Sequence, residues 1–195
     1  FAVLVAHNED VVRPGHGYAL HPHTDLEIVT WVLEGSLVHQ DSRGNSGVVH
    51  PGLAQRMSAG SGVLHSERND APRAARETRF VQMWLRPDEP GGDPSYAQRE
   101  VDVRSGLVPL VSGISGVDGV PIHASGAALH VARPATGEKL SLPDAPRLHV
   151  FVARGTVDLE GAGRLVEGDA ARFTGEGGPT LTGEGDAEVL VWQLP

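Results

Sequence analysis

Several kinds of residue are rare or missing in this sequence, and each shortage excludes a class of protein or site. The 195 residues include no cysteine, which excludes disulfides, thiolate metal sites and cysteine nucleophiles. Lys139 is the only lysine and the formal net charge is -9, so we expect no direct binding to nucleic acid or to an anionic membrane. No apolar run is long enough to cross a bilayer. A chain without disulfides suits the reducing cytoplasm, which we predict as its location.

Short apolar runs separated by turns make up most of what is present. The chain holds 25 glycines and 14 prolines, and many of them fall between runs rich in β-branched residues. This spacing predicts an all-β sandwich or barrel. Helical character is confined to residues 94–99 and 71–76, and neither stretch carries a sustained 3.6-residue apolar stripe. The main runs that predict strands are residues 1–6, 26–33, 36–39, 80–85, 148–153 and 188–194.

A weak internal repeat divides the chain. Residues 30–39 form an apolar run that turns at Gly35 and continues as a second run, and residues 149–158 repeat this arrangement around Gly155. Two copies of one strand–turn–strand unit predict two tandem β-barrels of the jelly-roll kind. We place the N-terminal domain at residues 1–105 and the C-terminal domain at residues 106–195.

Two pairs of potential metal ligands lie in the N-terminal half. His21 and His23 are two residues apart, and so are His65 and Glu67. Side chains two apart on a strand share a face, so two adjacent strands would bring three imidazoles and one carboxylate together. This ligand set suits Fe, Mn, Co, Ni, Cu or Zn, and it resembles sites that leave positions open for a substrate or dioxygen.

The remaining histidines give weaker signals. His39 and His50 are next to turns, where solvation explains them, and His123, His130 and His149 have no ligand partner at the same spacing. The second copy of the repeat also lacks the histidine pair. We therefore predict one metal site, in the N-terminal domain, and a C-terminal domain without metal. Neither serine nor cysteine has a triad-like setting that would indicate a hydrolase.

The motifs resemble those of a known superfamily and, more closely, of one family within it. The pattern Gly15-x5-His21-x-His23-x3-Glu27 resembles the first cupin motif, and Gly62-x2-His65-x3-Asn69 resembles the end of the second. From about Phe1 to Tyr96 the chain is similar to the pirin family; beyond residue 105 it resembles only the second barrel of a bicupin. The matching residues include Asn8-Glu9-Asp10, His21-Pro22-His23, Val32-Leu33-Glu34-Gly35, Asp41-Ser42, Gly44-Asn45-Ser46-Gly47, Pro51-Gly52, His65-Ser66-Glu67 and Gln82-Met83-Trp84-Leu85.

The resemblance implies a bicupin fold and a metal-dependent quercetin 2,3-dioxygenase, which opens a flavonol ring with dioxygen. Carried over by position, the metal ligands are His21, His23, His65 and Glu67. The implied ion is Fe(II), with Ni, Mn, Co, Cu or Zn as alternatives. Glu67 would also act as the catalytic base that removes the proton of the flavonol 3-hydroxyl.

Glu27 competes with Glu67 for the fourth ligand position. In other cupins the glutamate of the first motif is the ligand, and its spacing puts Glu27 on the face of His23. The pirin pattern favours Glu67 as the ligand and leaves Glu27 a role in the pocket, including that of an alternative catalytic base.

The same resemblance implies a function of another class. Pirin-like proteins include non-enzymatic regulators, whose metal state would set a surface for a transcription factor or a metabolic enzyme. An acidic chain without a basic patch suits contact with a protein better than contact with DNA. Turnover of quercetin by metal-loaded protein would separate the two functions.

Overall fold

The computed structural model describes residues 1–69 and 76–195. All regular elements in these ranges are β-strands, and none of the described residues forms a helix that could cross a membrane. Residues 94–99, which have helical character in the sequence, form no helix, because Ser95–Glu100 form strand β9 and pair with β6 (Leu53–Ser58). Pairing with a neighbouring strand outweighs a weak local preference. The stretch predicted at residues 71–76 lies outside the described residues, apart from its last position.

The chain forms two compact units. The first contains Phe1, Val3–Val101 and Val120–Ser125, and the second contains Ala2, Asp102–Gly119 and Gly126–Pro195. Val120–Ser125, which includes the short strand β11 (Val120–Pro121), thus belongs with the first unit although it follows the predicted boundary at residue 105.

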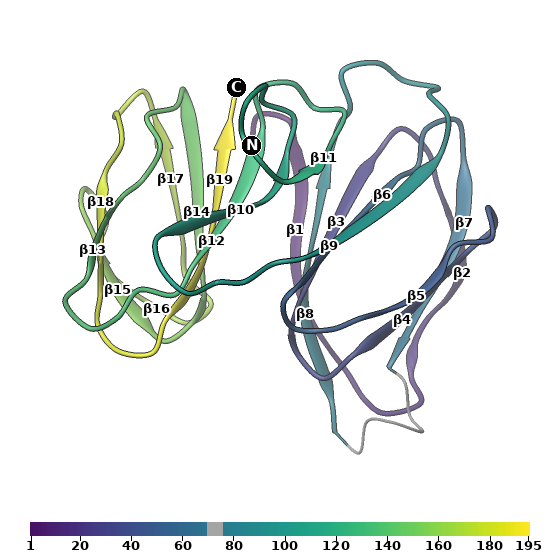
Figure 1. Cartoon of the computed structure of the whole chain (residues 1–195), viewed down its shortest axis with the longest axis horizontal. Helices are drawn as coiled ribbons and strands as arrows, with labels where there is room; N and C mark the ends of the chain where they lie inside the picture. Colours follow the sequence, from purple (N-terminus) through teal and green to yellow (C-terminus); the bar gives the residue numbers. More distant parts are fainter. Residues whose placement is uncertain (70–75) are drawn as a thin grey trace. The chain divides into compact units, whose positions relative to one another are not determined.

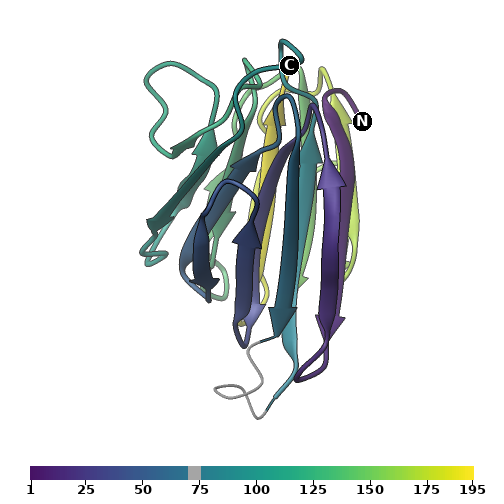
Figure 2. The same cartoon turned by 90° about the vertical axis from the view of Figure 1, so that its right-hand side faces the viewer.

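The first unit consists of two antiparallel sheets, which form separate layers in Figure 1. One sheet has the order β1 (Leu4–Val12), β8 (Thr78–Leu85), β3 (Glu27–Glu34), β6 (Leu53–Ser58) and β9. The other has the order β2 (Gly17–His23), β7 (Val63–Asn69), β4 (Leu37–Asp41) and β5 (Ser46–Val49). The long β1 and β8 lie side by side in both views (Figure 2), as their register requires.

The interior of the first unit has a polar layer between two apolar clusters. On β3, Ile28 belongs to one cluster and Val32 to the other, while Thr30 lies between them. Alternating side chains share a face, so all three residues point into the barrel. The first cluster is Ile28, Met57, Ala59 and Val63; the second is Val12, Val32, Leu37, Val49, Leu53 and Phe80.

The second unit repeats the arrangement of two antiparallel sheets. The strands of one sheet are neighbours in the order β10 (Leu107–Ser112), β12 (Ala128–Ala132), β19 (Glu188–Leu194), β14 (Arg147–Arg154) and β17 (Ala170–Thr174). The other sheet has the order β13 (Lys139–Ser141), β18 (Thr180–Gly183), β15 (Thr156–Leu159) and β16 (Gly163–Val166). Its core includes an apolar cluster that contains Leu148, Val150, Leu159, Leu181 and Val191.

The glycines that mark the predicted repeat occupy equivalent turns. Gly35 joins β3 to β4 with φ 74°, and Gly155 joins β14 to β15 with φ 72°. A Cβ atom would lie 2.8 Å from the carbonyl oxygen of Glu77 at Gly35 and 2.2 Å from that of Asp186 at Gly155. Both turns therefore require glycine.

The prediction of an all-β fold with two tandem jelly-roll barrels is confirmed.

Candidate metal centre

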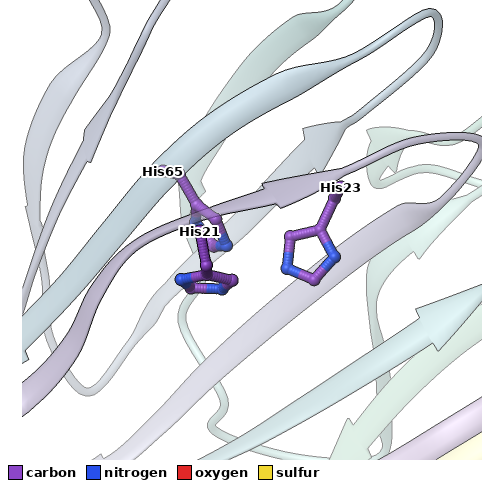
Figure 3. Close-up of side chains that lie close together, drawn as sticks. All are labelled: His21, His23 and His65. Carbon is purple, nitrogen blue, oxygen red and sulfur yellow. The ribbon is translucent and has the colours of Figure 1, made fainter.

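Two neighbouring strands bring His21, His23 and His65 together. In the antiparallel pair β2–β7, His21 lies opposite His65, and a bulge between Tyr18 and His21 adjusts the side chains to one face. Ring centroids are 4.4 Å apart for His21 and His65, 5.0 Å for His23 and His65, and 4.9 Å for His21 and His23. The three rings converge on one space (Figure 3). They offer nitrogen atoms that all lie within 4.8 Å of one another.

The ring nitrogens of these imidazoles are placed to act as ligands. The Nδ1 atom of His21 donates to the carbonyl of Ala19 at 2.7 Å, which leaves the lone pair on Nε2. Nε2 of His23 and both ring nitrogens of His65 are buried without a hydrogen-bond partner among the described residues. Burial, followed by the neighbouring imidazoles, lowers the pKa of His65 to about 3, and burial and then His21 lower that of His23. A metal ion would satisfy the lone pair that each neutral ring carries.

Glu67 lies on the same face of β7 as His65 and is held from the opposite sheet. Its carboxylate, 2% exposed, accepts two hydrogen bonds of 2.9 Å from Nε2 of Gln82. The Nε1 atom of Trp84 donates to Oε1 of Gln82 at 3.0 Å and so orients the amide. Burial raises the pKa of Glu67 to about 7, against the opposing effect of Gln82. The carboxylate is next to His65 but does not join the grouping of His21, His23 and His65.

His39, which the sequence suggested was solvated, is part of this interior. It is fully buried on β4, opposite Glu67 on β7, and its ring lies 5.4 Å from that of His65. Tyr96 stacks on it at 5.0 Å. A ligand atom of His39 lies within 4.8 Å of those of His65 and Glu67. The spacing of His39 and Asp41, like that of the other pairs, was the signal that could have identified it.

The structure does not bring Glu27 to the histidines. Trp84 lies 5.0 Å from His23 and therefore faces the barrel interior; it is opposite Ile28 in the register of β3 and β8. The preceding residue, Glu27, must face the other side of the sheet. Alternation of side chains counted from His23 predicts the wrong face for Glu27. The reason is that the chain between the two strands passes through Asp25 at φ 52° and is not extended.

Glu27 instead holds the segment Val120–Ser125. Its carboxylate, 2% exposed, accepts one hydrogen bond of 3.2 Å from the backbone nitrogen of His123 and contacts Nδ1 of the same residue at 3.2 Å. Arg56 donates from Nε to the carbonyl of Pro121 at 2.9 Å, and lies 4.0 Å from Glu27. A cavity of about 670 Å³ lies at this place, with Ser58 in its wall. Glu27 thus has a structural partner on the outer face of the sheet.

The other histidines lie apart from the cluster. His50 is half-exposed and contacts Glu100 at 3.3 Å. His130 and His149 are buried on β12 and β14 of the second unit. Within residues 1–69 and 76–195, both groups of side chains that could share one ion lie in the first unit.

Two jelly-roll barrels in tandem, with a histidine cluster inside the first, define a two-domain cupin. Residues 2–85 match the family model described as Pirin, and residues 110–194 match that of the quercetinase C-terminal cupin domain. The chain belongs to the pirin family.

Similar proteins cover almost the whole chain. It is 53% identical to a provisionally named quercetin 2,3-dioxygenase of Mycobacterium tuberculosis (strain H37Rv), over 98% of this chain and 80% of that protein. It is 33% identical to a quercetin 2,3-dioxygenase of Escherichia coli K12, over 100% and 84%. The crystal structure of the bacterial pirin YhhW from E. coli in complex with nickel(II) superposes with a TM-score of 0.90, at 33% identity, and covers 100% of this chain and 83% of that one.

Proposed function

We propose that this pirin is a metal-dependent dioxygenase that opens the ring of a flavonol such as quercetin with dioxygen. The observation that carries the proposal is the convergence of three buried or half-buried imidazoles beside a buried carboxylate. The names of the relatives and the nickel complex of the E. coli pirin add support. The lack of cysteine supports the cytoplasm as the place of the activity.

The residues that would hold the ion are His21, His23, His65 and Glu67. Three neutral nitrogen donors and one anionic oxygen suit a divalent first-row metal, and we propose Fe(II), with Ni, Mn, Co, Cu or Zn as substitutes. When bound, the ion would supply a Lewis acid that acidifies the flavonol hydroxyl and a place for dioxygen.

The chain's own side chains would prepare the substrate. Glu67 would accept the proton of the flavonol 3-hydroxyl, since burial keeps its affinity for a proton near that required at neutral pH. Gln82 would hold the carboxylate in place through its amide. Trp84 beside His23 and Tyr18, whose ring centroid lies 6.4 Å from that of His21, supply aromatic walls for a flat ligand.

Turnover of quercetin tests the proposal. Protein stripped of metal and reloaded with Fe(II) should consume dioxygen and remove the visible absorbance of quercetin, and protein left without metal should not. If no first-row ion restores turnover while metal still binds, the dioxygenase function fails. The regulatory function would then be the better explanation, and capture of a protein partner that depends on the metal would test it.

A further inference from the structure

The barrel contains a second set of donors deeper than the three histidines described first. His39, His65 and Glu67 have ligand atoms within 4.8 Å of one another, and each residue is at most 2% exposed. The two sets share only His65. His21 and His23, the other members of the first set, are only half-buried. The barrel therefore has an outer group of donors toward solvent and an inner group within its polar layer.

Asp41 fixes which nitrogen of His39 is free. The carboxylate of Asp41 accepts hydrogen bonds from the backbone nitrogens of Arg43 (2.9 Å) and Asn45 (3.0 Å) and from Nδ2 of Asn45 (2.8 Å), which favour its ionised form. A carboxylate can only accept, so Nε2 of His39, at 3.3 Å from Oδ2, carries the hydrogen. The lone pair of the neutral ring is then on Nδ1.

The lone pair on Nδ1 of His39 is buried without a partner in the part of the chain that the structure describes. An unsatisfied buried acceptor destabilises the fold. The arrangement of carboxylate, histidine and free lone pair is one that proteins use to orient a metal ligand. Stacking on Tyr96 further restricts the ring.

We propose that His39, His65 and Glu67 form an inner coordination position for a divalent first-row metal ion. It is an alternative to the outer position, where Glu67 would complete the set of His21, His23 and His65, because both positions need His65 and Glu67. This inference rests on the proposed metal binding at the site and extends it: one ion has two places, and the inner one is removed from the half-exposed mouth of the site. His39 is thus a ligand of the ion and not a packing residue.

Binding of Co(II), measured by equilibrium dialysis and by its visible absorption, tests the inner position. The H21A/H23A variant lacks the outer group but keeps the inner one. It should bind about one Co(II) per chain, with a spectrum different from that of the wild type. Adding His39→Leu should weaken this binding at least tenfold. Leucine is the residue of the second unit's core at the equivalent place, Leu159, so packing should survive. H39Q, which can still donate to Asp41, should give the same loss.

The controls separate the inner position from the dioxygenase function. His50→Ala, which removes a half-exposed imidazole of the same unit, should leave Co(II) binding in the H21A/H23A background unchanged. Complete loss of Co(II) in H21A/H23A, or equal binding with and without His39, overturns the inner position. The outcome does not depend on turnover. If wild-type protein fails to consume quercetin but the Co(II) pattern holds, the dioxygenase proposal fails and the inner position stands.

Discussion

The two barrels of this chain have the same arrangement of strands but differ in the polarity of the side chains at equivalent interior positions. In the first, Thr30 on β3 lies opposite Gln82 on β8, and the two side chains are hydrogen-bonded at 3.3 Å. In the second, the corresponding pair across β14 and β19 is Val150 and Val191. All four residues are buried. The same backbone register therefore carries a polar pair in one barrel and an apolar pair in the other.

The facing sheets repeat the contrast. His39 is opposite Glu67 in the pair β4–β7, whereas Leu159 is opposite Leu181 in the pair β15–β18. Since buried polar atoms without partners destabilise a protein, the apolar pairs at these positions of the second barrel favour its stability. The first keeps a layer of donors whose unsatisfied atoms are explained by a ligand. The difference indicates that the polar layer serves a function, since the fold forms without it.

Removing the residue common to both donor groups should have the largest effect on this contrast. In His65→Ala the inner group keeps only two donors, and the outer site loses one of its three imidazoles, so we expect loss of the bound ion. Metal affinity should fall by more than about a hundredfold. This exceeds the tenfold to hundredfold loss that is typical when a residue that only hydrogen-bonds to a metal ligand is removed. Metal content after dialysis measures it, with His50→Ala as the control. Retention of a full equivalent of metal would show that His65 is not a ligand.

The two glutamates provide a matched comparison across one sheet. Glu67→Gln removes the buried charge of the site, and we expect quercetin turnover to fall at least about a hundredfold, in the range of a lost general base. Glu27→Gln should leave metal content and turnover close to wild type, because Glu27 lies on the outer face. Measuring metal content and quercetin turnover in both variants in parallel tests which glutamate is the ligand. If Glu27→Gln loses the metal and Glu67→Gln keeps it, the ligand assignment is reversed.

Replacing Gln82 by valine gives the first barrel the residue that the second barrel has at the equivalent position, Val191. The Glu67 carboxylate would lose both hydrogen bonds from the amide, and Nε1 of Trp84 would lose its acceptor. We expect metal affinity to fall about tenfold to a hundredfold through the misplaced ligand. Urea unfolding of the metal-free protein should show a loss of about 1–3 kcal/mol. Unchanged affinity would mean that Gln82 does not position Glu67.

The second barrel should contribute a smaller, pH-dependent effect. Burial, and then Arg172, lower the pKa of His149 from 6.5 to about 4. The unfolded chain therefore binds a proton first as pH falls below 6.5, and folding stability is lost between pH 6.5 and 4. From pH 7 to 5 the loss should be about 2 kcal/mol. Urea unfolding at the two pH values measures it, and His149→Gln should reduce the difference. An equal difference in the variant would exclude His149 as the cause.

The local sequence pattern was sufficient to predict much of the site. Spacing of two along extended segments determines that His21 shares a face with His23, and His65 with Glu67, because side chains alternate on a strand. Short apolar runs, glycine turns and the repeat around Gly35 and Gly155 likewise determine two β-barrels. These features depend on contacts and angles close in sequence.

Three features were decided only by the tertiary structure. Glu27 lies away from the histidines because the turn at Asp25 interrupts the alternation on which a count along the sequence depends. Val120–Ser125 joins the first unit because Glu27 and Arg56 bind it across more than sixty residues of chain. His39 is buried because β4 pairs with β7, which sets it opposite Glu67. Pairing between distant strands determines which side chains meet, and a spacing within one strand does not contain that information.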